Sequence, residues 1–203
     1  MSVVERPRRR RAETVERLLD AALETFAEIG FAAASVEDVC SRGGFTRGAF
    51  YSSFRTKDEL FAALFARETA ANIARAEEQL TGIELEADPV GAAVERCLST
   101  FRADRTWVLV HTEYRLLAAR SPAAAAVLRE HSAGLHSRLT ELIEHAVVRT
   151  GVRLAVPADS LARMVLALHD GLVIAHVPDR DGASDSIELE RTALLLLLRA
   201  ATT

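Results

Sequence analysis

The chain has 203 residues, a formal net charge of −4 and 49% hydrophobic residues. It contains no apolar run of the roughly 18 residues that a membrane span needs, and its basic start lacks the apolar segment of a signal peptide. We therefore expect a cytoplasmic protein with no membrane partner. Scarce aromatic residues and glycines favour an all-α fold.

The first residues combine a basic arm with a regular helical pattern. Residues 1–11 carry five arginines, which can follow DNA phosphates or the minor groove, or can serve only as a solubilising tail. From Ala12 to Ile29, apolar residues recur at three- and four-residue spacing, which predicts one helix ended by Gly30. The arginines of the arm are Arg6, Arg8, Arg9, Arg10 and Arg11.

The segment 35–60 predicts two short helices and the start of a third. Ser35 is a good N-cap with Asp38 three residues on, and the helix ends at the glycine pair 43–44. Thr46 caps a second helix that runs to about Ser53. A full capping box at 56–59 then opens the third helix.

Two short helices joined by a tight glycine turn indicate a helix-turn-helix. Arg47 can reach a guanine edge or a phosphate, and the small residues after it let the backbone approach a groove. The net charge does not oppose this, because residues 1–60 carry ten basic and ten acidic side chains. The candidate DNA contacts are Ser35, Thr46, Arg47, Gly48, Ala49, Tyr51, Ser52 and Lys57.

The same residues carry a family resemblance. The runs AALETFAEIGF (21–31), SVEDV (35–39) and GGFTRGAFYSSFRTKDELF (43–61) resemble the DNA-binding domain of the TetR family of bacterial transcription regulators. The resemblance implies a small helical DNA-binding domain, a linker helix and a larger helical domain for ligand binding and dimerisation.

The rest of the chain also reads as helices. The predicted spans are 57–80, 89–103, 107–119, 122–150, 157–177 and one ending near Ala200, which makes nine helices in all. We expect a basic arm at 1–11, a helix-turn-helix domain at 12–56, a linker helix at 57–80 and a ligand-binding and dimerisation domain at 81–203.

The last two predicted helices are apolar on several sides, with five consecutive leucines at 194–198. Such helices are either enclosed in the core of one chain or shared in a twofold four-helix interface. The resemblance favours the interface, and a homodimer would read a palindromic operator in double-stranded DNA. The interface candidates are Leu161, Val165, Leu168, Leu172, Leu194, Leu197 and Leu198.

The resemblance also implies a pocket for a small-molecule effector. Polar and aromatic residues among the apolar helices suggest a hydrophobic or aromatic effector with one or two polar anchors, although each can instead be an ordinary core or surface residue. His131 and His136 are five residues apart, the wrong pitch for a metal site on one helix face. The ligand candidates are Trp107, His111, Tyr114, Arg115, His136, Met164 and His169.

We therefore predict a dimeric repressor that a small effector releases from its operator. The alternatives are a TetR-like activator and a helical interaction protein that does not bind DNA. The sequence has no paired-carboxylate site, no nucleophile with a base in register and no cofactor fingerprint, so we expect neither an enzyme nor a bound cofactor or metal.

Overall fold

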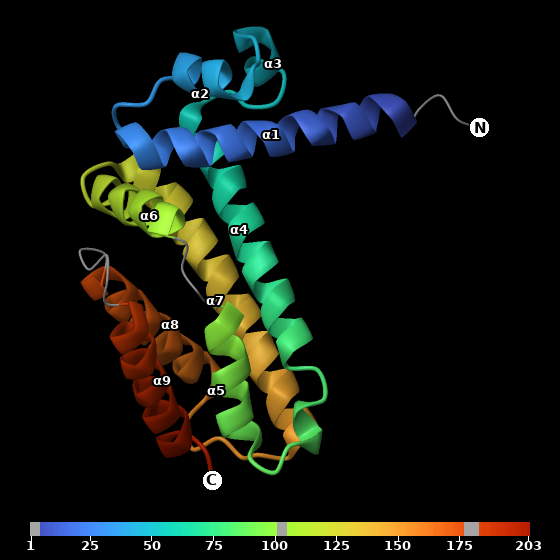
Figure 1. Ribbon diagram of the computed structural model, residues 1–203, viewed down its shortest axis with the longest axis vertical. Helices are drawn as coiled ribbons and strands as arrows, with labels where there is room; N and C mark the ends of the chain where they lie inside the picture. The colour runs from blue at the N-terminus through green and yellow to red at the C-terminus, as the bar shows by residue number, and fades with distance from the viewer. Residues whose placement is uncertain (1–4, 101–104, 177–182) are drawn as a thin grey trace. The chain divides into compact units, whose positions relative to one another are not determined.

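The computed structural model describes residues 5–100, 105–176 and 183–203. Within these ranges it has nine α-helices, one 3-10 turn and a single isolated bridge between Leu154 and Thr202, so the predicted all-α fold is confirmed. The elements are α1 (Glu5–Ile29), α2 (Val36–Gly43), α3 (Arg47–Tyr51), α4 (Lys57–Gln79), η1 (Ile83–Leu85), α5 (Pro89–Thr100), α6 (Arg105–Ala118), α7 (Pro122–Thr150), α8 (Ala158–His176) and α9 (Ala183–Ala200) (Figure 1).

The first helix begins earlier than its apolar pattern predicts. We expected a start at Ala12, but α1 begins at Glu5, while residues 1–4 lie outside the described residues. Pro7 falls in the first turn, where a backbone N–H has no intrahelical partner to lose, so it does not break the helix. Within the described residues, the arginines from Arg6 to Arg11 therefore lie on α1.

Two compact units make up the chain, and each is described by itself. The first comprises residues 1–67 and 105–131, and the second comprises residues 68–104 and 132–203. Helices α4 and α7 each begin in the first unit and end in the second. The first unit thus joins the helix-turn-helix to α6 and the start of α7, which the sequence alone assigned to the C-terminal domain.

An aromatic cluster forms the centre of the first unit. The ring of Phe31 meets Phe26 edge-on at 5.0 Å and Tyr114 edge-on at 4.9 Å, and Phe61 stacks on Tyr114. These four side chains are almost fully buried, and burying each contributes about 2–3 kcal/mol. Ile29, expected on the apolar stripe of α1, is instead 45% exposed at the end of that helix.

Local signals fix the turns of the helix-turn-helix. The Asp38 backbone N–H donates to Ser35 Oγ at 3.2 Å, and the Ser35 N–H donates to Asp38 Oδ2 at 2.8 Å, so the predicted capping box is present. The Ser35 hydroxyl, which donates to Asp38 Oδ2 at 2.6 Å, and the Ser35 N–H together lower the pKa of Asp38. Gly44 ends α2 with a φ of 71°, a left-handed conformation that favours glycine.

The N-terminus of α4 differs slightly from its predicted capping box. The Glu59 N–H donates to Thr56 Oγ1 at 3.0 Å, as expected. The Glu59 carboxylate, however, accepts from the backbone N–H of Arg55 at 2.7 Å, one residue before the predicted partner. The carboxylate thus ties the connection after α3 to the first turn of α4.

In the second unit, α9 packs against both α5 and α8. The Asp88 side chain accepts the Gly91 N–H at 3.1 Å and so caps the start of α5. Arg149, near the end of α7, donates to Leu80 O at 2.7 Å and pairs with Glu84. These contacts fix the η1 turn between α4 and α5.

Candidate nucleic-acid interface and apolar cavity

The tip of the helix-turn-helix leaves polar side chains exposed on α3. Thr46 caps this helix by accepting the Ala49 N–H at 3.2 Å, and Phe50 is fully buried beneath it. Arg47, Gly48 and Ser52 are exposed at the surface, and Tyr51 is 50% exposed. The first unit therefore carries a short helix anchored from below by Phe50, with polar groups available on its outer side.

Arg47 is held in place by its neighbours on the tip. Its Nη1 lies 2.6 Å from Glu37 Oε1, and its guanidinium carbon lies 5.9 Å from the centre of the Tyr51 ring. Hydrogen bonding to Tyr51 and the charge of Glu37 raise the pKa of Arg47, so it stays a cation. A nucleic acid that uses Arg47 must replace the Glu37 contact.

Lys57, one of the candidate DNA contacts, already has partners within the first unit. Its Nζ donates to the backbone oxygens of Phe31 and Ala34, the latter at 2.6 Å, and lies 4.4 Å from the centre of the Phe31 ring. Burial lowers the pKa of Lys57, and the charges of Asp58 and Glu113 oppose that shift. A phosphate contact would have to use the remaining ammonium hydrogen.

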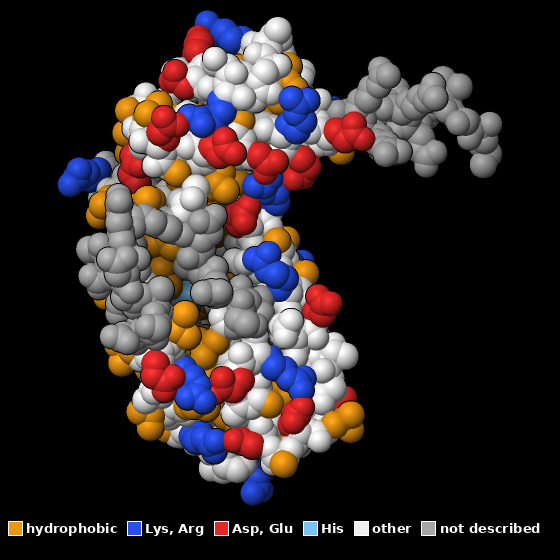
Figure 2. Space-filling model, viewed as in Figure 1, with side chains coloured by type: hydrophobic (Ala, Val, Ile, Leu, Met, Phe, Trp, Pro, Cys, Tyr) orange, Lys and Arg blue, Asp and Glu red, His pale blue; other side chains and the backbone are white. Residues whose placement is uncertain are grey.

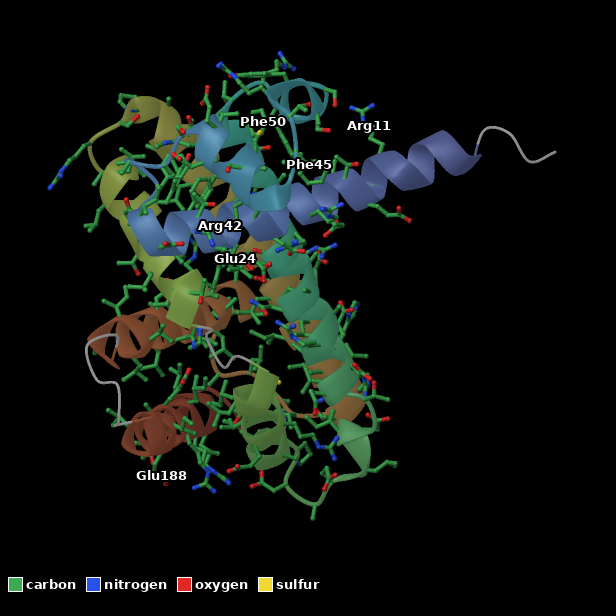
Figure 3. All side chains as sticks on the ribbon, turned by 45° about the horizontal axis from the view of Figure 1, so that its top comes forward. Arg11, Glu24, Arg42, Phe45, Phe50 and Glu188 are labelled. Carbon is green, nitrogen blue, oxygen red and sulfur yellow. The ribbon has the colours of Figure 1, made fainter. Side chains whose placement is uncertain are left out.

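Three arginines brace the helix-turn-helix, and sequence reasoning missed all three. Arg17 donates to Gly43 O at 3.1 Å, and Arg11 donates to Ser52 O at 3.1 Å, so α1 holds the C-terminal ends of both short helices. Arg42 reaches back to α1, where it lies 3.5 Å from Glu24 and donates to Thr25 Oγ1 at 3.0 Å (Figure 3).

No periodic pattern distinguishes these arginines from ordinary solvated charges. On the face seen in Figure 2, acidic and basic side chains intermingle over the first unit. Local pairing, and not net charge, therefore decides which cations face outward.

An apolar cavity of about 170 Å³ lies within the second unit. Residues of α5, α7, α8 and α9 form most of its wall, together with the turns after α4 and α7. His169 Nδ1 and Glu190 Oε1 lie 2.6 Å apart, and among the described residues of this wall Cys97 is the other ionisable side chain. Burial raises the pKa of Cys97 to about 11, so the thiol stays protonated and adds no charge.

Of the seven predicted effector contacts, His169 is the one that lines the cavity. Trp107 and His111 stack with ring centres 5.6 Å apart against Phe65 of the first unit, where Tyr114 is also buried. Arg115 is half-buried on α6, His136 Nε2 lies 3.0 Å from Asp159 O, and Met164 is exposed on α8. The structure therefore does not bring the seven together.

Glu190 was missed, although the sequence holds a signal for it. It lies four residues before Leu194 and eight before Leu198, on the same helix face, just as His169 follows Leu161 and Val165 on α8. A polar residue in register with an apolar stripe points to the interior. Comparing the two stripes would have paired His169 with Glu190.

Comparison with known proteins identifies the family. Residues 18–64 match the model for bacterial regulatory proteins of the tetR family, and residues 86–198 match the model for the C-terminal part of BetI-type transcriptional repressors. The chain belongs to the TetR family of transcriptional regulators. The resemblance read from the helix-turn-helix is thus confirmed.

Individual known regulators are similar to this chain. The HTH-type transcriptional regulator UidR of Escherichia coli (strain K12) is 31% identical over 131 residues, which cover 64% of this chain and 62% of UidR. A transcriptional regulator from Rhodococcus sp. Rha1 has a TM-score of 0.67 at 27% identity, over 92% of this chain and 95% of that chain. FadR from Bacillus subtilis, solved in complex with stearoyl-CoA, has a TM-score of 0.70 at 20% identity, over 90% and 96%.

These relatives are regulators and not enzymes, as the sequence predicts for this TetR-family chain. The described residues hold no group of three or more His, Cys, Asp or Glu side chains placed to bind a metal ion. None of the described helices has the length and hydropathy that a membrane span requires.

The residues predicted to form the dimer face of this TetR-family protein do not share one environment. Leu161 and Leu194 are buried, and with Val165 and Leu198 they line the cavity of their own chain. Leu168, Leu172 and Leu197 are half-buried. The large apolar side chains that α8 and α9 expose are different ones: Met164, Ile174, Ile187, Leu189 and Leu196.

Proposed function

We propose that this TetR-family chain is a homodimeric repressor that leaves a palindromic operator when a small apolar effector fills the cavity of its second unit. The observation that carries the proposal is the cavity itself. A wall that is apolar except for one acid–base pair and a few small polar groups is suited to an organic molecule and not to structural packing alone.

The exposed side of α3 supports operator binding. Arg47 and Tyr51 offer a cation and a hydroxyl-bearing ring, while Gly48 leaves room for close approach of a groove. Thr46, Ala49, Ser52 and Ser35 complete the set of candidate contacts around this tip. The match to a transcriptional repressor family supports repression over activation.

The exposed apolar side chains of α8 and α9 support a twofold interface. Met164 and Ile174 on α8, and Leu189 and Leu196 on α9, remain at the surface, with Leu196 67% exposed. Apolar groups gathered on adjacent helices indicate an interface between chains. This moves the interface away from Leu161 and Leu194, which face inward.

The class of effector follows from the cavity. The FadR structure holds stearoyl-CoA, which supports an apolar effector for a related fold. The volume of about 170 Å³ favours a much smaller molecule here. Helices α4 and α7 run through both units without interruption, so they are the elements by which occupancy of the cavity reaches the DNA-binding unit.

Operator selection from random duplexes, followed by gel shift, tests DNA binding. We expect a selected palindrome, and Arg47→Ala should weaken its binding by about 1–3 kcal/mol. Sequence-blind binding would refute the proposal.

Sedimentation tests the dimer. We expect Leu196→Glu to yield monomers and Val148→Glu, at an exposed valine on α7, to leave the dimer intact. A monomeric wild type would refute the twofold interface.

A further inference from the structure

The cavity of the second unit is small. Its volume of about 170 Å³ is close to the ~150 Å³ of an engineered apolar cavity that binds benzene. A single substituted ring, or a chain of similar volume, fills such a space. A molecule of about ten non-hydrogen atoms has a volume suited to this space.

Most polar groups on the wall are already engaged. Thr150 Oγ1 donates to Ala146 O at 2.8 Å, and Thr202 Oγ1 donates to Leu198 O at 2.8 Å. The wall contains no lysine or arginine among the described residues. Nothing in this part of the chain therefore offers a cation to an anionic ligand, apart from a protonated His169.

Glu190 provides the specific anchor. Its Oε1 lies against His169 Nδ1, and no donor in the described residues reaches its Oε2. The Glu190 side chain is 14% exposed, and its residue lines the cavity. A carboxylate oxygen without a donor can accept a ligand N–H or O–H in a charge-assisted hydrogen bond, which is stronger than a neutral one.

We propose that the effector is a small apolar molecule, about the size of one substituted ring, whose head group donates a hydrogen bond to Glu190 Oε2, and that the cavity rejects carboxylates. The inference rests on the proposed function, because it names the class of molecule that occupies the effector site. A ligand carboxylate would meet Glu190 at short range in an apolar space, where like charges disfavour each other strongly.

Four probes with the same ring test the head group: benzyl alcohol, benzylamine, toluene and benzoate. Binding to the full chain without DNA is measured by calorimetry. We expect the alcohol or the amine to bind at least about tenfold more tightly than toluene and benzoate, the ratio that one charge-assisted hydrogen bond supplies. The better of the two shows whether the head group is neutral or cationic.

Glu190→Gln tests the anchor residue, and Ala93→Phe tests whether the probes bind in the cavity. Glu190→Gln keeps the size of the side chain but removes its charge, so the donor probes should lose their advantage and benzoate should gain affinity. Glu188→Gln is the matched control, since Glu188 is exposed on the same helix and pairs with Arg191. Ala93→Phe adds a ring to the cavity wall and should abolish binding of every probe.

The inference is overturned if wild type binds no donor probe, if benzoate binds best, if Glu190→Gln keeps the wild-type ranking, or if Ala93→Phe still binds. Thermal melts of each variant show that it is folded. Gel shift on the selected operator is run in parallel. Intact operator binding with failed probe binding overturns this inference alone, whereas failed operator binding overturns the proposed function.

Discussion

Tyr114 lies flat on Phe61, with ring centres 3.6 Å apart and planes 9° from parallel, and its hydroxyl donates to Asp58 Oδ1 at 3.0 Å. Asp58 and Phe61 stand in the first turns of α4, just after the helix-turn-helix, while Tyr114 belongs to α6. Helix α6 is therefore part of the core that supports the helix-turn-helix. A residue predicted from sequence to touch the effector is a central packing residue of the first unit.

Tyr114→Phe keeps the stacked ring and removes the hydrogen bond to Asp58, so we expect a loss of about 1–2 kcal/mol in the free energy of unfolding. Tyr114→Ala also removes the ring and should cost about 3–5 kcal/mol. Urea unfolding followed by the fluorescence of Trp107, the one tryptophan of the chain, reports on this same core. Equal stability of wild type and Tyr114→Phe would show that the hydrogen bond contributes nothing.

Gly30 and Glu113 form a second contact between the helix-turn-helix and α6. Gly30 has a φ of +84°, a Cβ placed on it would lie 2.8 Å from Glu113 Oε1, and that oxygen accepts the Ala32 N–H at 3.3 Å. The added carbon would displace the flexible end of the Glu113 side chain and disturb its hydrogen bond from Ala32, so Gly30→Ala should cost somewhat more than the roughly 1–2 kcal/mol of left-handed strain alone. Gly151→Ala is the matched control, with a φ of +71° and open space around the added carbon.

A double-mutant cycle separates steric overlap from strain at Gly30. In the Glu113→Ala background, Gly30→Ala should cost about as much as Gly151→Ala does in wild type, since the overlapping carboxylate is gone. We expect a coupling energy of about 0.5–3 kcal/mol from chemical unfolding. Additive costs in the cycle would mean that the side chain of Glu113 moves aside freely.

Lys57 and Arg47 should respond differently to alanine substitution. Lys57→Ala leaves the backbone oxygens of Phe31 and Ala34 without their donor, so it should lower the free energy of unfolding by about 1–3 kcal/mol and weaken binding to all DNA sequences alike. Arg47→Ala removes an exposed side chain and should leave stability within about 0.5 kcal/mol while weakening the selected operator. Thermal melts beside gel shifts separate the two; unchanged stability in Lys57→Ala would contradict its structural role.

The helix-turn-helix could be predicted closely because its signals are local. Ser35 and Asp38 are three residues apart, and Gly44 ends its helix through its own backbone conformation. The partners of α6 could not be predicted in this way. Tyr114 meets a residue 56 positions earlier, and helical periodicity shows that one face is buried without showing which element buries it.

The same limit explains the cavity and the dimer face. Leucine stripes on α8 and α9 predict burial but cannot distinguish the wall of an internal cavity from an interface between chains. Leu161 and Leu194 line the cavity, whereas Leu196, which belongs to the same run of leucines as Leu194, is exposed. Where a charged residue such as Glu190 shares the stripe, the sequence does carry usable information on which face lines a cavity.

The Cys97 thiol makes the second unit sensitive to alkaline pH. Burial raises its pKa from 9.0 to about 11, so the folded chain keeps the proton that the unfolded chain releases. Stability from this group is fully present below pH 9 and is lost as pH rises toward 11, with about 1 kcal/mol gone by pH 10. Burial also raises the pKa of Tyr114 above its usual value near 10, so the measurement should stop at pH 10. Urea unfolding at pH 8 and pH 10 should show this loss in wild type and a smaller one in Cys97→Ala; the same pH dependence in both would show that Cys97 ionises as freely in the folded chain as in the unfolded one.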